Sequence, residues 1–461
     1  IRSAYTGSHV HIENIISLNN CFIASSKEGP SFLENGVVLE NVILDRQNHI
    51  RNNALLSNVA TGENVHVENG ARVSDCMIGA NSHIACGELI SNLLFPFHEQ
   101  HHNNSFLIAS TIEGQCNIAA GATIGSNHNS RAADGELFAG RGFWPGLETD
   151  FKHNSHFAPF TLVAKASFEK ELNIHLPFSL ISKNPQGRVV IYPGYWYYHN
   201  MYALARNAWK FTKRDKRLHR SLHIETDFLG PDSLTAMIRG IDFLRKQIDP
   251  EPSLSALLEN TSTVKAPRHV EAGGLVYGDK AVILNPLKGI LAYAELLIFF
   301  CGRLFLREMP GNTMPLVTWE NFGGQFIPGD EADTFRKSVR AGDISSWKDI
   351  HRFYREQAAE YGSHLSGLAN HIAAFLLGKK RINDDDRESL KRKAAITAEK
   401  MLSGAKFSRQ KDFENEYRLK SYRNSSEMTA VVGCSEDDPF LTDYTQTMEY
   451  VIKALRGPSN L

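Results

Sequence analysis

The feature that most constrains the fold is a six-residue rhythm of aliphatic residues. Ile112, Ile118 and Ile124 follow one another at intervals of six, and similar hexads begin at Val67, Ile78 and Val163. A period of six fits neither the 3.6-residue turn of an α-helix nor the strict alternation of a strand. It is typical of a solenoid, in which each hexad forms one short strand and one turn. Weaker hexads extend upstream, so we expect stacked parallel β-coils over residues 1–183.

This rhythm resembles that of the left-handed β-helix, or hexapeptide-repeat, superfamily. The resemblance implies a left-handed parallel β-helix, a homotrimer with sites between subunits, and in most members acyl or acetyl transfer. Residues 103–104, 125–131 and 140–146 also resemble an uncharacterised bacterial family of long β-helix proteins with helical C-terminal regions. That second likeness implies no particular activity.

Composition excludes several classes of protein. The 461 residues hold 50 basic and 51 acidic side chains, so the chain lacks the charge of a general nucleic-acid or membrane-surface binder. The six cysteines form no CxxC pair, which favours a reducing, cytoplasmic location over a disulfide framework. Residues 290–305 are apolar, but Glu295 and Arg303 interrupt them, which indicates a buried helix and no membrane partner. The first residue is Ile1 and not Met, which leaves open whether residues precede it.

The second half of the chain has a different period. Apolar residues recur at intervals of three and four residues, which predicts an all-α region over residues 184–461. Helices are expected at 201–210, 234–248, 286–305, 347–377, 387–402 and 442–455. The basic run from Lys210 to Arg220 admits two interpretations, a docking site for phosphate groups or a solvated helix face.

Two interruptions of the rhythm are expected to form inserted loops, near residues 86–106 and 126–155. Insertions in a solenoid become loops on a rigid scaffold, and such loops often carry function. The first segment holds His98, His101 and His102, which could bind one zinc or iron ion. In the carbonic-anhydrase branch of the superfamily, three histidines from two subunits hold the metal. The alternative interpretation is that these are ordinary polar loop histidines.

The second segment supplies candidates for acid–base chemistry. His128 occupies the fifth place of a hexad, where a small residue is usual, so it either serves a function or ends the coil. A histidine could remove the proton from an acceptor hydroxyl or amine, as a loop or coil histidine does in the acyltransferases that this chain resembles. His153 and His156 are alternatives for the same role.

The same segment contains candidate binding residues. Arg131 and Arg141 could hold a phosphate or carboxylate, with Asp134 orienting one of them. Trp144 could stack on a ring of the ligand or could plug the end of a coil. Asn127 and Lys152 complete the candidate substrate- or phosphate-binding set.

Three functions follow as hypotheses. The first is transfer of an acyl group from a thioester, with acyl-CoA as donor, to a small sugar-like or amino acceptor. The second is a metal-dependent hydratase or hydrolase that uses His98, His101 and His102. The third is a non-catalytic ligand-binding or scaffold trimer. In all three hypotheses the chain assembles with copies of itself, and none of them involves nucleic acid.

Overall fold

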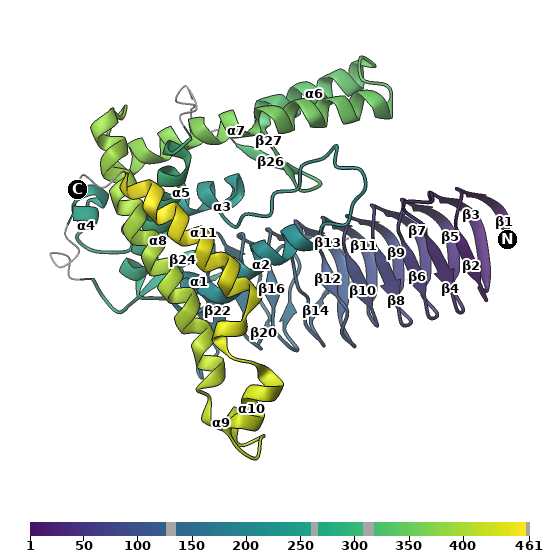
Figure 1. The fold of residues 1–461 in the computed structure, drawn as a ribbon, viewed down its shortest axis with the longest axis horizontal. Coiled ribbons are helices and arrows are strands. Elements are labelled where there is room, and N and C mark those ends of the chain that lie inside the picture. Colours follow the sequence, from purple (N-terminus) through teal and green to yellow (C-terminus); the bar gives the residue numbers. More distant parts are fainter. Residues whose placement is uncertain (126–134, 260–265, 308–317, 458–461) are drawn as a thin grey trace.

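The computed structural model describes residues 1–125, 135–259, 266–307 and 318–457. A parallel β-solenoid forms the N-terminal part, and a largely helical region packs against its C-terminal end (Figure 1). Seven long strands succeed one another along the solenoid: β1 (Arg2–Thr6), β3 (Ser17–Ile23), β5 (Val38–Leu44), β7 (Leu55–Thr61), β9 (Arg72–Ile78), β11 (Glu88–Leu94) and β13 (Phe106–Ile112). Shorter strands form a second face: β2 (His11–Glu13), β4 (Phe32–Glu34), β6 (His49–Arg51), β8 (His66–Glu68), β10 (His83–Ala85) and β12 (Glu99–Gln100).

The later coils contain short strands only. They are β14 (Thr123–Ile124), β15 (Leu137–Ala139), β16 (Trp144–Pro145), β17 (Asp150–Phe151), β18 (His156–Phe157), β19 (Leu162–Val163), β20 (Ser167–Phe168), β21 (Asn173–Ile174) and β22 (Leu180–Lys183). They continue the parallel pairing, with β14, β17 and β20 in one ladder and β15, β18 and β21 beside it. The parallel ladder of coils ends at β22.

Over much of the solenoid one coil takes 17 residues, which is one residue fewer than three regular hexads would take. Leu39, Leu56 and Val73 are partners in successive strands, and each is buried. From β3 to β13, the fourth residue of each long strand has a positive φ, so the strand bends there and the alternation of inward side chains starts afresh. For this reason Leu39, Val42 and Leu44 all point inward. Intervals of six are still found where the notable hexads lie, at the buried Ile112, Ile118 and Ile124.

Asparagine occupies many of these bends, because its short polar side chain tolerates the left-handed conformation. At one corner the side chains form a ladder along the solenoid. The amide of Asn41 donates to Asn58, and the amide of Asn58 donates to Asp75, at 3.0 and 2.9 Å. A second ladder joins Asn52 to Asn69. Each ladder ties one coil to the next outside the apolar interior.

The prediction of an inserted loop at 86–106 is wrong. These residues form one more coil: β11 pairs with β9 and β13, and β10 pairs with β12. The segment looked irregular because its inward positions include His98 and Gln100 in place of aliphatic residues. The prediction of an insertion across 126–155 is too broad, because β15 to β18 lie within it and are paired. In the register of the described strands, Ile124 and Leu137 are the partners of Leu107 and Ser110, so the extra residues of the chain fall between them.

The C-terminal region is mainly helical, with helices α1 (Tyr195–His199), α2 (Met201–Arg214), α3 (Pro231–Arg245), α4 (Leu254–Glu259), α5 (Pro286–Phe305), α6 (Gly329–Ala341), α7 (Trp347–Leu377), α8 (Asp384–Phe413), α9 (Glu416–Leu419), α10 (Ser425–Val432) and α11 (Pro439–Arg456). Helix α5 is apolar and buried, and α3, α7 and α8 pack against it. It begins at Pro286, where a missing N–H costs nothing. Among the described helices, none combines the length and hydrophobicity that a bilayer crossing requires.

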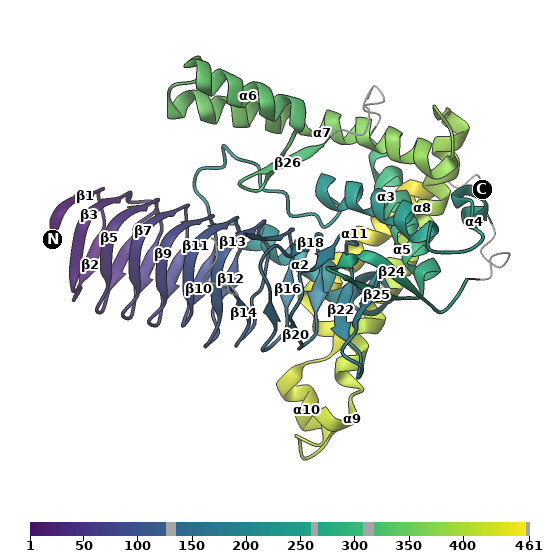
Figure 2. The same ribbon diagram turned by 180° about the vertical axis from the view of Figure 1, so that it is seen from behind.

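The prediction that residues 184–461 are all-α is wrong in one respect. The strands β23 (Val189–Tyr192), β24 (His269–Val276) and β25 (Asp279–Leu284) extend one sheet of the solenoid beyond β22. A separate hairpin consists of β26 (Trp319–Phe322) and β27 (Gln325–Pro328). The shared sheet joins the two parts of the chain, and Figure 2 shows β24 and β25 beside β22 from behind. Helix α6 and the first half of α7 form an arm that lies alongside the solenoid.

Candidate functional site

The three histidines proposed as metal ligands do not converge. His98 lies inside the solenoid, where its Nε2 is 3.1 Å from Gln100 Oε1, and burial lowers its pKa to about 4. The His101 ring stacks on His83, and the His102 ring packs against His101. Within the described residues no three His, Cys, Asp or Glu side chains are grouped so that they could hold a metal ion. The residues present therefore do not fit the expected zinc or iron centre.

His101 instead ends a ladder of stacked rings on the face formed by the short strands. Phe32, His49 and His66 stack at centroid distances of 4.7 and 4.5 Å, and the ladder continues through His83 to His101. Burial, followed by the charges of neighbouring histidines, lowers the pKa of His66 to about 4. The sequence analysis missed this ladder, although the 17-residue spacing from Phe32 through His49 and His66 to His83 was a visible signal.

Arg141 is buried between the solenoid and the helical region, and its side chain is fully engaged. Its Nε and Nη2 donate to the Asp232 carboxylate at 3.1 and 2.8 Å. Its Nη1 donates to the carbonyl oxygens of Glu225 and Asp227 at 3.2 and 2.7 Å. Arg141 as a whole is 1% exposed, and its guanidinium lies over the ring of Phe160. We conclude that Arg141 joins the two parts of the chain and does not present a free guanidinium to a ligand.

Trp144 and His153 also have structural roles. Trp144 packs on the core beside the buried Trp196, with ring centroids 6.1 Å apart. His153 is buried, and its Nε2 lies 3.0 Å from the carbonyl oxygen of Ile108 in β13, two coils earlier. Neither side chain is placed to meet a ligand at the surface.

Four predicted residues lie outside the described residues. They are Asn127, His128, Arg131 and Asp134.

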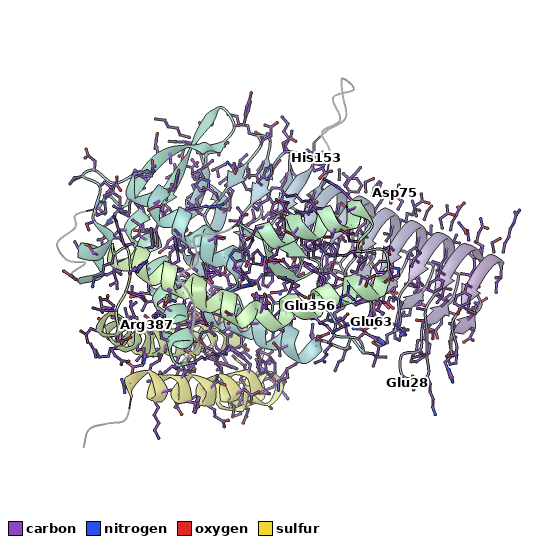
Figure 3. All side chains as sticks on the ribbon, turned by 90° about the horizontal axis from the view of Figure 1, so that it is seen from above. Glu28, Glu63, Asp75, His153, Glu356 and Arg387 are labelled. Atoms are coloured by element: carbon purple, nitrogen blue, oxygen red, sulfur yellow. The ribbon has the colours of Figure 1, made fainter. Side chains whose placement is uncertain are left out.

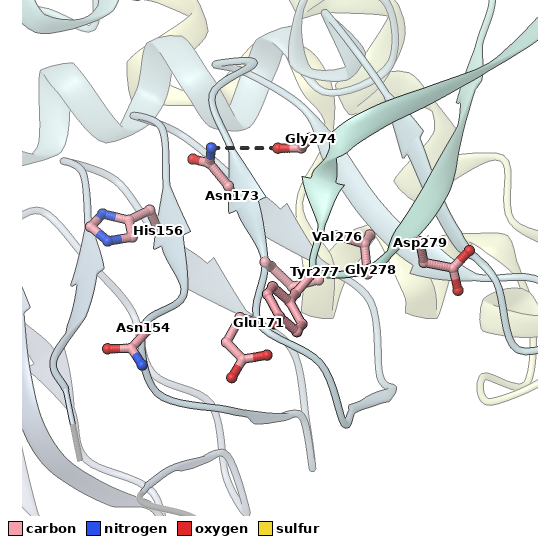
Figure 4. Close-up of a pocket in the computed structure, with 10 residues that line it drawn as sticks. Asn154, His156, Glu171, Asn173, Gly274, Val276, Tyr277, Gly278 and Asp279 are labelled. Atoms are coloured by element: carbon pink, nitrogen blue, oxygen red, sulfur yellow. Dashed lines mark hydrogen bonds between the residues drawn. The ribbon is translucent and has the colours of Figure 1, made fainter. Parts of the chain in front are cut away.

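His156 and Lys152 lie at a cleft between the solenoid and the β24–β25 hairpin, which we call the hairpin cleft (Figure 4). Its volume is about 830 Å³. The solenoid side carries Asn154, His156, Glu171 and Asn173, and the hairpin side carries Gly274, Tyr277 and Asp279. Lys152 pairs with Glu171 at 2.8 Å and so stands beside the cleft.

The hairpin is held to the solenoid by backbone contacts. Leu172 forms a bridge with Val276, the Tyr277 N–H donates to the Glu171 carbonyl oxygen, and the Asn173 amide donates to the Gly274 carbonyl oxygen. The register of β24 shifts between Ala272 and Val276, which is a β-bulge of the kind that re-aims side chains. The cleft is therefore built by two segments about 100 residues apart in the chain, which sequence reasoning had no means to pair.

The side chains of the hairpin cleft are polar. Hydrogen bonding to Lys152 lowers the pKa of Glu171, and hydrogen bonding to Lys170 lowers the pKa of Asp279, so both carboxyl groups are charged at neutral pH. His156 is exposed and lies beside the Phe138 ring. Tyr277 is 75% exposed at the edge. Amides, carboxylates and an exposed aromatic ring can hydrogen-bond and stack on a small polar molecule such as a sugar.

A row of outward side chains, apolar except for Thr111, leads along the solenoid to this cleft. The row occupies one register position in successive coils: Tyr5, Phe22, Ile43, Ala60, Met77, Leu93, Thr111 and Phe138. We call it the apolar stripe. Ile43 and Met77 are each 57% exposed, and Phe22 is 46% exposed. The next two positions in the same register are His156 and Asn173.

Comparisons with known proteins place the chain among proteins whose activity is not described. A sequence model of the family described as "Domain of unknown function (DUF4954)" matches residues 1–248, just over half of the chain. An "Uncharacterized protein" of Treponema pallidum (strain Nichols) is 37% identical over 377 residues, which is 76% of this chain. The chain spans about half of the length of that relative, 52%.

Proposed function

The chain belongs to the DUF4954 family, and we propose that it is an acyltransferase that moves an acyl group from a thioester to a small sugar-like or amino acceptor. The finer parts of the proposal are a left-handed coil, membership of the hexapeptide-repeat superfamily, and a homotrimer with its site at the edge of the subunit interface. Acyl-CoA would be the donor, and the location would be the cytoplasm, where that donor is found.

The observation that carries the proposal is the register of the apolar stripe. Soluble proteins rarely expose a contiguous apolar patch without a partner to cover it. The stripe runs along the solenoid and passes, in the same register, into His156 and Asn173 of the hairpin cleft. A second copy packed on the stripe would therefore stand next to His156, and its residues would help to enclose the cleft. This arrangement supports a site between subunits.

His156 would act as the general base. The acceptor oxygen or nitrogen attacks the thioester carbonyl carbon while the imidazole takes the acceptor proton. A new C–O or C–N bond forms, the C–S bond breaks, and the leaving thiolate recovers a proton from the imidazolium. Asn154, Asn173 and Glu171 would hydrogen-bond the acceptor. Lys152 would keep Glu171 charged and in place.

The chemistry is tested by thiol release from acetyl-CoA with glucosamine or galactosamine as acceptor. The His156→Ala variant should lose about 100-fold or more in kcat. The matched control is His102→Ala, also an exposed histidine of the solenoid, which should keep wild-type activity. If the wild-type protein releases no thiol above the blank, or if both variants lose activity equally, the catalytic proposal is wrong.

The assembly is tested separately by sedimentation velocity. The wild-type chain should sediment as a trimer, and Met77→Glu should dissociate it because a carboxylate would be buried in the stripe. The control is Tyr450→Glu on α11, which is 75% exposed and far from the stripe in the chain. A monomeric wild-type protein would refute the interface. A stable trimer that releases no thiol would refute catalysis and favour the scaffold hypothesis.

A further inference from the structure

We propose that a second cleft, between the solenoid and the start of α7, binds a small phosphate-bearing molecule. This basic cleft is lined by Arg46, Arg220, Ser221, Lys348, His351 and Arg355, and its volume is about 700 Å³. It lies several coils from the hairpin cleft, so it is a separate site and does not depend on the acyltransferase proposal. Pockets of this size accommodate small molecules.

Three separate segments build the basic cleft. Arg46 follows β5 at a corner of the solenoid, Arg220 and Ser221 belong to the chain after α2, and the other side chains come from α7. Lys348, His351 and Arg355 are spaced by three and four residues, so they share one face of the helix. The Ser221 hydroxyl lies 2.8 Å from His351 Nδ1 and connects two of the segments. Figure 3 shows Glu63, on the next coil, at the solenoid edge near this arm.

The cations in the first turns of α7 differ in how they are paired. Arg352 pairs with Asp349 at 3.0 Å and approaches Glu356 at 4.0 Å on its own helix. Lys348 and Arg355, which face the cleft, form no ion pair within the described part of the chain. Both are exposed to solvent. The helix therefore neutralises one of its cations internally and presents the other two to the cleft.

The acidic residues of the basic cleft do not cancel this charge. Glu63 is already engaged, because His219 Nδ1 lies 2.7 Å from one of its oxygens and the His219 N–H donates to the other. Burial raises the pKa of Asp45, and the Glu63 charge adds to that effect. Four permanent cations thus line the cleft: Arg46 lies 3.7 Å from Asp45 and Arg220 lies 3.8 Å from Asp215, while Lys348 and Arg355 have no such partner among the described residues. An anion with several oxygens can accept hydrogen bonds from the guanidinium groups in pairs.

The size of the cleft and the neighbouring charges favour a compact anion over RNA. Most of the basic run that leads to Arg220 is already paired. Lys210 and Arg214 both contact Glu99, and Arg217 holds Asp215 at 2.9 Å. No continuous basic track therefore leads away from the cleft along that run, as a nucleic-acid backbone would require. At the cleft, the cations without an ion pair among the described residues are Lys348 and Arg355.

The proposal is tested by isothermal titration calorimetry of the full chain with inorganic phosphate, pyrophosphate and ADP, each in separate titrations. At least one probe should bind saturably, and Lys348→Gln combined with Arg355→Gln should weaken it by about tenfold or more, a loss of about 1.4 kcal/mol. The matched control is Arg352→Gln, a neighbouring cation of α7 that pairs with Asp349 and does not line the cleft, and it should change the Kd by less than about twofold. Far-ultraviolet circular dichroism would verify that each variant is folded.

The preferred probe identifies the ligand class. Tightest binding of ADP would indicate a nucleotide, and tightest binding of pyrophosphate would indicate a free polyphosphate. Two results would overturn the proposal: no saturable heat with any of the three probes, or an equal loss of affinity in the Arg352→Gln control. Arg220→Gln, on a different segment, provides a second variant that should also weaken binding if the site is built as described.

Discussion

Replacing Arg141 by methionine should destabilise the protein more than any surface charge removal. The change deletes four hydrogen bonds and leaves the Asp232 carboxylate, whose side chain is 9% exposed, without its counter-charge. Removing one partner of a buried ion pair costs about 3–5 kcal/mol. The carbonyl oxygens of Glu225 and Asp227 also lose a donor. We therefore expect a loss of about 3–5 kcal/mol in the free energy of unfolding.

The assay is urea unfolding followed by tryptophan fluorescence, because Trp144 and Trp196 lie in the core at this junction. The control is Lys165→Met, which breaks the Lys165–Glu148 pair on the same solenoid and should cause little change, since both side chains are about two-thirds exposed. The double variant Arg141→Met, Asp232→Leu should recover part of the loss, because no buried charge is left unpaired. The reasoning is refuted if Arg141→Met costs less than about 1 kcal/mol, or if Asp232→Leu in that background recovers nothing.

Three further predictions concern the solenoid. The pKa of His66 is lowered from 6.5 to about 4, so its contribution to stability is complete above pH 6.5 and is lost as pH falls toward 4, by about 3 kcal/mol at most. The melting temperature of His66→Phe should fall less steeply over that range, and an unchanged slope would contradict the argument. Burial, with the charge of Asp232, raises the pKa of Glu113 from 4.5 to about 8, so stability declines as pH rises between these values. Glu113→Gln should therefore raise the melting temperature above pH 8 and have little effect below pH 4.5. Scanning fluorimetry at both pH values measures this, and an equal change of melting temperature at the two would contradict the reasoning. Asn58 has a φ of 55° and two ladder hydrogen bonds, so Asn58→Ala should cost about 2 kcal/mol and Asn58→Gly less; equal losses in urea unfolding would mean that the backbone conformation is not responsible.

The helices were largely predictable from the sequence, because their signals are local. The apolar periodicity marked 286–305 and 347–377, and these are the bounds of α5 and α7. Ser346 and Asn383 cap the helices that follow them, as their residue types indicate. The strands β23 to β25 were missed, although β22–β23 and β24–β25 are local hairpins; only the pairing of β23 with β25 joins segments that lie far apart in the chain.

The candidate site was predictable only in part. His156 was among the candidates, and it lines a cleft, whereas Arg141 and His153 proved to be buried and Trp144 partly buried. Residue type suggests chemistry, but burial depends on which coil or helix covers a side chain. The cations of α7 were overlooked for the same reason, since nothing in the helix itself shows that Arg46 and Arg220 lie opposite.

The sequence by itself determined that the chain coils into a parallel solenoid and then turns helical, because inward aliphatic spacing and helix periodicity are properties of neighbouring residues. Only the tertiary structure decided the 17-residue coil, the inward position of His98, and the strands that join the two parts. It also decided where the clefts lie. Both clefts bring together segments about 100 residues apart or more, and such contacts depend on the stacking of coils and helices, which no local pattern encodes.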